Sequence, residues 1–171
     1  FCGIIACSEK DFKMIKQTAV RVGDFVSPES CFVAIRGMRT LKIRLKNHQE
    51  NALKVFQFLK KKKTVKNIYF LPDKDNKYHK LWKKYFKSAN GLITFSIEKK
   101  RNISLFIDSL KLLKIGFSWG GYESLILPIN KLNPTTKNYK SDLFWFRIHV
   151  GLESSIDIIK DLKNGFQKYE K

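Results

Sequence analysis

The apolar positions at the start of the chain predict one buried strand followed by a helix. Residues 1–7 form an almost continuous apolar run that ends at Ser8, which is typical of a strand buried on both faces. Ser8 is a good N-cap for a helix over residues 9–22, and Gly23 is a natural stop for that helix.

Two further helices are expected next. The pair Ser27-Pro28 predicts a helix that reaches about Ile35, since proline suits the first helical position. Over residues 40–62, apolar side chains recur at three- and four-residue spacing and form one stripe on a charged helix. That helix closes with the lysine run 60–63, where positive charge suits a helix C-terminus. The stripe consists of Leu41, Leu45, Ala52, Val55, Phe56 and Leu59.

From residue 65 onward, predicted strands and helices alternate. The strands are expected at 65–71, 91–97, 124–127 and 143–150, the helices at 76–86, 103–110 and 154–169, and a polar connection at 130–141. The last helix begins with Ser154 and has Asp157 three residues later, which is the spacing of a capping box. Alternation of this kind predicts an α/β fold in which helices cover a sheet, with an α+β C-terminal domain.

The predicted first strand indicates a domain boundary. A lone strand of this type cannot satisfy its own edges, so we expect residues 1–38 to be the tail of a larger domain. Residues 39–171 are expected to form a small C-terminal domain that opens with the long helix. The chain does not begin with Met, and we expect it to be a fragment or a processed product.

The net charge of +19 suggests an anionic partner at first sight. The chain has 28 Lys and only 6 Arg, however, whereas specific nucleic-acid surfaces favour the bidentate fork of Arg. The lysines also occur in nearly every predicted element. We therefore expect no nucleic-acid partner, although a lysine-rich anion-binding domain without enzyme activity stays open as an alternative.

Metal and membrane sites are not expected either. Cys2, Cys7 and Cys31 have no metal-ligand spacing, which favours a reducing cytoplasm, and His48 and His79 lie in predicted helices and are assigned no chemistry. No apolar run approaches the roughly 20 residues that span a bilayer.

Residues 117–125 interrupt this regular pattern with the sequence Phe-Ser-Trp-Gly-Gly-Tyr-Glu-Ser-Leu. Gly120 and Gly121 permit left-handed torsions and a close approach of the backbone to a ligand. By themselves these residues fit a structural turn as well as they fit a binding loop.

The predicted strand 143–150 carries a second candidate. Strand alternation places Phe144, Phe146, Ile148 and Val150 on one apolar face, and Leu143, Trp145, Arg147 and His149 on the other. Arg147 has no carboxylate within the strand, and the carboxylate of a ligand would match its fork. A salt bridge from Arg147 to Glu153 or Asp157, or a solvated position at a strand edge, explains the residue equally well.

Three segments together resemble signature segments of the cysteine/methionine-metabolism family of pyridoxal-phosphate enzymes. They are Arg-Gly-Met-Arg-Thr-Leu at 36–41, Ser-Trp-Gly-Gly-Tyr-Glu-Ser-Leu at 118–125 and Arg-Ile-His-Val-Gly-Leu-Glu at 147–153. They occur in the order of that family and at about its spacing. The His-x-x-Trp and Gly-Leu-x-x-Phe segments that begin at His79 and Gly91 add to the resemblance, which covers nearly the whole chain.

The resemblance implies a fold-type I, aspartate-aminotransferase-like subunit that binds pyridoxal 5'-phosphate, with residues 1–38 as the tail of its large cofactor-binding domain. It places the Schiff-base lysine a few residues before Phe1, so no catalytic residue is expected here and no cofactor-binding residue is identified. Arg147 would bind the α-carboxylate of an amino-acid substrate, and Phe117, Ser118 and Trp119 would line that site. The full-length enzyme would be a homotetramer, a dimer of dimers.

Two positions bear on the reaction that the resemblance implies. Trp119 and His149 stand where members of the family that act at Cγ usually have Leu and Ser, and here the chain resembles the bacterial β-lyases. The implied reaction is cleavage of L-cystathionine to homocysteine, pyruvate and ammonia in methionine biosynthesis. A γ-lyase, γ-synthase or sulfhydrylase stays open, as does an inactive remnant kept for oligomer contacts. Met38 and Phe117 depart from the usual Leu and Tyr.

Overall fold

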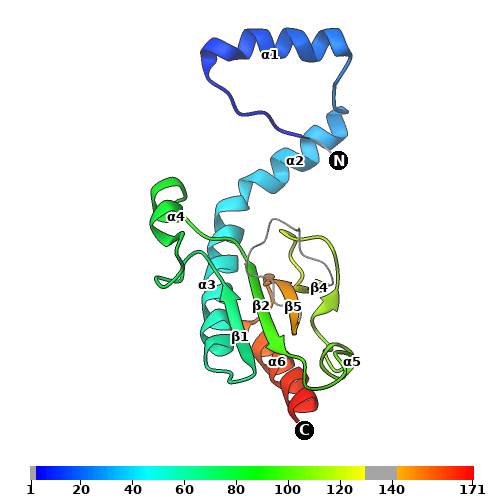
Figure 1. The fold of residues 1–171 in the computed structure, drawn as a ribbon. Coiled ribbons are helices and arrows are strands. Elements are labelled where there is room, and N and C mark those ends of the chain that lie inside the picture. The colour runs from blue at the N-terminus through cyan, green and yellow to red at the C-terminus, as the bar shows by residue number, and fades with distance from the viewer. Residues whose placement is uncertain (1–2, 130–141) are drawn as a thin grey trace. The chain divides into compact units, whose positions relative to one another are not determined.

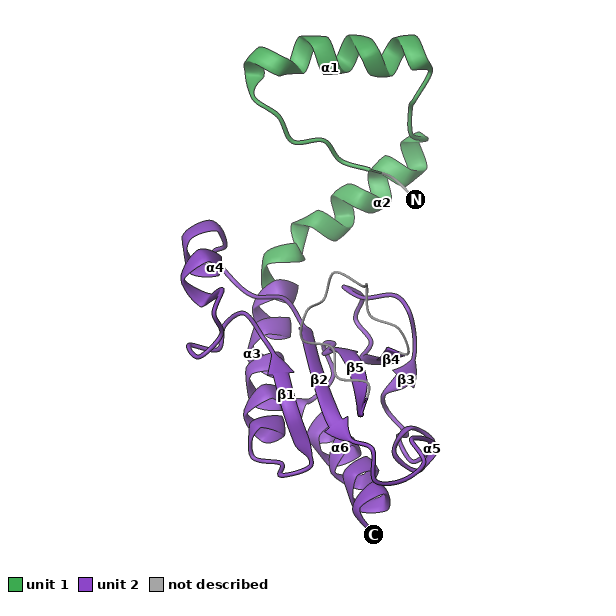
Figure 2. Ribbon diagram, viewed as in Figure 1, with its two compact units in different colours: residues 1–43 green, residues 44–171 purple. Residues whose placement is uncertain are grey.

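The computed structural model describes residues 3–129 and 142–171, and the chain divides into two compact units (Figure 2). The first unit spans residues 1–43 and the second spans residues 44–171. The predicted polar connection at 130–141 lies outside the described residues. Within the described part, no helix is both long enough and apolar enough to cross a membrane.

The first unit contains two helices. Helix α1 (Glu9–Val22) ends at Gly23, whose left-handed φ of 73° lets its N–H and that of Asp24 bond to the carbonyls of the last turn. Helix α2 (Pro28–Arg39) begins at Ser27, and the Ser27 side chain accepts a hydrogen bond from the Ser30 N–H at 3.2 Å. The predicted start of each helix and the Gly23 stop are therefore confirmed.

Two predictions for this unit are wrong. Residues 3–7 form no strand, because the described part of the unit holds no second strand with which they could pair. Helix α2 continues to Arg39 rather than ending near Ile35, since the Arg36-Gly37-Met38 segment stays helical.

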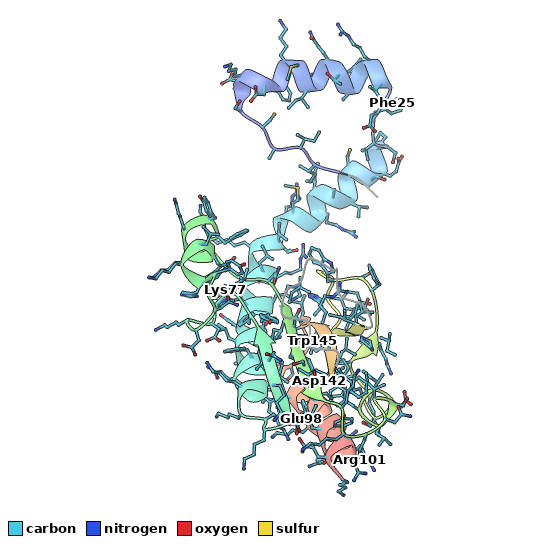
Figure 3. The ribbon with its side chains drawn as sticks, viewed as in Figure 1. Phe25, Lys77, Glu98, Arg101, Asp142 and Trp145 are labelled. Carbon is cyan, nitrogen blue, oxygen red and sulfur yellow. The ribbon has the colours of Figure 1, made fainter. Side chains whose placement is uncertain are left out.

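The first unit buries no residue of either α1 or α2. Its large apolar side chains are exposed instead, and Phe25, between the two helices in Figure 3, is 87% exposed. An apolar surface of this extent is unusual in a self-contained domain. The exposed residues include Ile4, Ile5, Phe12, Met14, Val20, Val22, Phe32, Val33 and Ile35.

The second unit is built around a five-stranded mixed sheet in the order β1-β2-β5-β4-β3 (Figure 1; β3 is labelled in Figure 2). Its strands are β1 (Val65–Tyr69), β2 (Leu92–Glu98), β3 (Lys114–Ile115), β4 (Leu125–Ile129) and β5 (Leu143–His149). All neighbouring strands are antiparallel except β3 and β4, which are parallel. Strand β5 lies at the centre, and its register pairs Arg147 with Thr94 of β2 and with Leu127 of β4.

One face of the sheet holds the hydrophobic core. Helices α3 (Leu41–Lys60) and α6 (Ser155–Glu170) supply apolar side chains to the same buried cluster as β2 and β5. Phe95 and Phe146, paired across these strands, stack with ring centroids 5.2 Å apart within it. The predicted apolar stripe is buried from Ala52 onward, whereas Leu41 is exposed. The sheet covered by helices is thus confirmed, and the chain is α/β.

Other details of the second unit differ from the prediction. Strand β3 was not expected, helix α4 (His79–Tyr85) is shorter at both ends, and helix α5 (Ser104–Ile107) is a single turn. The Ser154 side chain forms no cap hydrogen bond, and the backbone N–H groups of Asp157 and Ile158 bond to the Ser154 carbonyl. Gly91 leaves no room for a side chain, since a Cβ there would lie 2.2 Å from the Val150 carbonyl oxygen.

A buried carboxylate ties α6 to the segment after α5. Asp161 is 8% exposed and accepts backbone hydrogen bonds from Lys111, Leu112 and Leu113 at 2.8–2.9 Å. Three N–H donors satisfy the carboxylate and fix the chain just before β3.

Candidate functional site

The face of β5 that turns away from the core carries the candidate site. Phe146, Ile148 and Val150 are buried in the core, and Phe144 packs against it, as the alternation predicts. Trp145, labelled in Figure 3, is buried on the opposite side and stacks on Tyr69 with ring centroids 5.8 Å apart. The two residues that follow on this side are Arg147 and His149, so the sheet itself places them next to each other.

Arg147 contacts the segment that was singled out in the sequence. Its Nη2 donates hydrogen bonds to the carbonyl oxygens of Phe117 and, at 3.5 Å, Ser118, and its guanidinium lies over the Phe117 ring, 5.5 Å from the centroid. The Nε of Arg147 is buried and has no hydrogen-bond partner among the described residues. The Nε–H group is a hydrogen-bond donor, and a carboxylate oxygen is the strongest acceptor for it.

The alternative of a salt bridge from Arg147 to Glu153 does not hold for the described residues. The Glu153 carboxylate accepts hydrogen bonds from the Ser124 N–H at 2.7 Å and from the Ser124 hydroxyl at 2.8 Å. Ser124 Oγ in turn accepts the Gly151 N–H at 2.8 Å, and the Leu152 N–H bonds to Tyr122. Glu153 therefore anchors the end of the segment 117–124 to the chain that follows β5. No ion pair joins Arg147 to Asp157 in the described part either.

The middle of the segment is anchored by His149. Its Nε2 lies 3.2 Å from the Gly120 nitrogen and 3.1 Å from the Gly121 carbonyl oxygen. Gly120 has a φ of 87°, a left-handed conformation that side-chain-bearing residues rarely adopt. The two glycines therefore form a structural turn that is attached to His149.

A second buried histidine lies beside the first. His48 of α3 and His149 have ring centroids 5.1 Å apart, and both side chains are nearly inaccessible to solvent. His48 Nδ1 is 2.8 Å from the Val150 carbonyl, which only accepts, so this nitrogen carries a proton. Burial lowers the pKa of His149 below its ordinary value of 6.5, and the nearby His48 and Arg147 act in the same direction. The bond to Gly121 and the charge of Glu153 oppose that shift.

The predicted site residues come together in the structure. Phe117, Ser118 and Trp119 lie in the one segment that Arg147 contacts, and the side chains of Phe117 and Trp119 are mostly exposed. The sequence did not indicate that the segment 117–124 is held by His149, Glu153 and Ser124. Strand alternation did give one signal, because it placed His149 on the same face as Arg147.

The described residues do not suit the cofactor's lysine linkage. Every described lysine is exposed except the half-buried Lys62, whereas a lysine that forms a Schiff base at neutral pH needs a setting that lowers its pKa. Among the described lysines, Lys60 and Lys100 have a shifted pKa, and in both it is raised, by hydrogen bonds to Asp75 and to Glu98 respectively.

The described part of the chain contains no candidate metal site. No group of three or more His, Cys, Asp or Glu side chains there is arranged to hold a metal ion. Cys7 and Cys31 are exposed and free.

Comparison with known proteins gives one family. The family described as Cys/Met metabolism PLP-dependent enzyme matches residues 1–167. The chain is 34% identical to the L-alanine/L-glutamate racemase of Wolbachia pipientis wMel, over 94% of this chain and 41% of that protein. It is 32% identical to the cystathionine β-lyase of Escherichia coli strain K12, over 97% of this chain and 44% of that enzyme. The chain therefore spans less than half the length of these relatives.

The fold agrees with the family match. The cystathionine γ-lyase from Lactobacillus plantarum, solved in complex with L-serine, matches this structure with a TM-score of 0.84 and 27% sequence identity. The match covers 97% of this chain and 45% of that enzyme. Relatives of this chain thus include a β-lyase, a γ-lyase and a racemase, so the comparisons leave the reaction open.

Proposed function

The chain belongs to the Cys/Met metabolism family of PLP-dependent enzymes, and from that premise we propose that it is the C-terminal part of a carbon–sulfur β-lyase. The substrate would be L-cystathionine, and the products would be homocysteine, pyruvate and ammonia. The observation that carries the proposal is that Arg147 and His149 lie on one face of β5 and contact the same segment on either side of Trp119. The similarity to the β-lyase of Escherichia coli supports it.

In this proposal the chain binds and orients the substrate. The Arg147 guanidinium would bind the α-carboxylate through Nε, which has no other partner among the described residues. Phe117, Ser118 and Trp119 would line the same site, next to the guanidinium. A carboxylate fixed at this point sets the direction of the Cα–H bond, and orientation of that kind lowers the barrier of the chemical step.

The remaining parts of the site would come from outside this chain. Pyridoxal phosphate, when bound, supplies the electron sink for a carbanion at Cα. We propose that the lysine that holds it lies just before Phe1 and that the exposed apolar residues of the first unit pack against the same larger domain. A homotetramer and a cytoplasmic location complete the proposal.

A racemase is the second candidate, because the Wolbachia relative with that name is 34% identical to this chain. Racemisation and β-elimination both begin with removal of the Cα proton. They differ afterwards, since a racemase returns a proton to the other face of Cα and a lyase expels the sulfur. The carboxylate contact at Arg147 would serve both reactions equally.

Product analysis of the full-length protein tests the proposal. L-Cystathionine would be supplied in one reaction and L-alanine in another, with keto acids and D-alanine measured in both. Homocysteine and pyruvate in equal amounts support the β-lyase. Cysteine and 2-oxobutyrate from cystathionine would assign the protein to the γ-lyases, and D-alanine formation without keto acid would assign it to the racemases.

A further inference from the structure

His149 and Arg147 contact different parts of the same segment. Both side chains project from the same face of β5, two residues apart, which places them about 7 Å from each other along the strand. Arg147 contacts the carbonyls of Phe117 and Ser118, and His149 contacts Gly120 and Gly121. Trp119 is the residue between these two attachments, and its own side chain is 58% exposed. The main chain of Trp119 is therefore attached on either side.

We infer that His149 is a positioning residue, which holds the Gly120-Gly121 turn so that Ser118 and Trp119 stay beside the guanidinium of Arg147. The inference rests on the proposed function in one respect, namely that Arg147 binds the carboxylate of the substrate. His149 itself touches neither substrate nor cofactor in this account. It acts on the substrate only through the segment 117–121.

Imidazole chemistry suits this role. A neutral imidazole can hold the turn in either tautomer: with its proton on Nδ1, Nε2 accepts the Gly120 N–H, and with its proton on Nε2, it donates to the Gly121 carbonyl. The charged ring has protons on both nitrogens, so it can no longer accept the Gly120 N–H, and its Nδ1 proton is buried without a hydrogen-bond partner among the described residues. The ring cannot relax by turning to solvent, because it is 2% exposed and packs beside His48. A change of protonation at His149 is therefore transmitted to the turn.

The charges around His149 favour the neutral ring. Desolvation is the largest influence, and it lowers the pKa of His149. His48 from α3 and Arg147 from β5 lower it further, while Glu153 after β5 raises it. The lowered pKa favours the neutral ring, in which Nε2 can accept the Gly120 N–H.

Two variants separate the hydrogen bond from packing. His149→Leu removes the acceptor and keeps an apolar side chain in the site. His149→Gln keeps a side-chain oxygen near the position of Nε2 but cannot titrate. His79→Leu is the matched control, because His79 lies on α4 and its Nδ1 bonds to the Leu71 carbonyl, away from the segment. All three would be compared with wild type in the full-length protein.

Amide hydrogen exchange of the peptide that covers residues 117–124 reports on the turn without any turnover. We expect exchange to be about three- to tenfold faster in His149→Leu, as the loss of one hydrogen bond implies, and near wild type in His149→Gln and His79→Leu. Unchanged exchange in His149→Leu would overturn the inference. This result stands whichever reaction the protein catalyses, so it is separate from a failure of the proposed function.

Kinetics with the substrate then tests the link to Arg147. We expect His149→Leu to raise KM by about three- to tenfold with kcat within about twofold, since the carboxylate is bound in both the ground state and the transition state. The wild-type KM should also rise as the pH falls through the pKa of His149, and this rise should be absent in His149→Gln. An unchanged KM, or the same acidic rise in the Gln variant, would contradict the inference. If the protein proves to be a racemase, L-alanine replaces cystathionine in the same comparison.

Discussion

Replacement of Arg147 by Ala separates a substrate contact from a structural one. In the structure this side chain does two things, because Nη2 holds the carbonyls of Phe117 and Ser118 while the buried Nε has no described partner. The variant removes both the attachment of the segment and the proposed carboxylate contact. The rest of the segment stays anchored by His149 and Glu153, so we expect the fold of the second unit to persist.

The size of the effect follows from the charge on the partner. A hydrogen bond to a charged group contributes about 1.5–3 kcal/mol, so loss of the carboxylate contact should lower kcat/KM between about tenfold and 150-fold. The bonds from Nη2 to the two backbone carbonyls are exposed to solvent, so their loss should reduce the free energy of unfolding by only about 1 kcal/mol. The kinetic effect is therefore the larger of the two.

The assay measures steady-state kinetics with L-cystathionine and thermal unfolding of the same samples of full-length protein. Arg101→Ala serves as the control, since Arg101 is also an arginine of the second unit but is exposed and donates to the Lys171 carbonyl rather than to the segment 117–121. A variant of Arg147 with normal kcat/KM and a clearly lower Tm would refute the reasoning. That result would show that Arg147 attaches the segment 117–121 to β5 and does not bind the substrate.

Three further predictions concern stability and the cofactor. Asp161→Ala should lower the free energy of unfolding by about 3 kcal/mol or more, because it leaves the N–H groups of residues 111–113 without their acceptor; a denaturant midpoint equal to wild type would contradict this. Because the folded state lowers the pKa of His149, the unfolded state binds more protons, so the free energy of unfolding should fall as the pH drops below about 6.5. This acid-dependent loss of stability should be absent in His149→Gln, and equal pH profiles of stability for the two proteins would contradict the prediction. The 171-residue chain alone should bind no pyridoxal phosphate at a specific lysine; borohydride reduction that labels one lysine stoichiometrically would be the opposite result.

The elements that local patterns specify were predicted well. The alternation in residues 143–150 gave both the strand β5 and the division of its side chains between two faces, since the period of two depends only on the strand itself. The start of α2 at Ser27-Pro28 and the stop of α1 at Gly23 were likewise local, because each rests on the chemistry of one or two residues.

Pairing between distant segments was not predictable in the same way. The strand expected at residues 1–7 depended on neighbours that the described chain does not provide, and an apolar run by itself does not show whether a partner strand exists. The two-residue strand β3 is defined only by its pairing with β4, which no periodicity could indicate.

The site shows the same division. Its residues were found through resemblance to a family, and the family match covers residues 1–167. The contacts among these residues could not be predicted from the sequence motifs. The bond from Ser124 to Glu153 joins positions 29 residues apart, and the meeting of His48 with His149 depends on how α3 packs on the sheet. Only the folded chain reveals these contacts.

The central claim is that the Arg147 face of β5 binds the carboxylate of an amino acid. A crystal structure of the full-length protein with pyridoxal phosphate and L-serine would test it most directly, since the related γ-lyase has been solved with that amino acid. We predict that the serine carboxylate lies within hydrogen-bond distance of Arg147 Nε, with the segment 117–121 still attached to His149. A serine carboxylate bound elsewhere, with Arg147 in contact only with Phe117 and Ser118, would contradict the account.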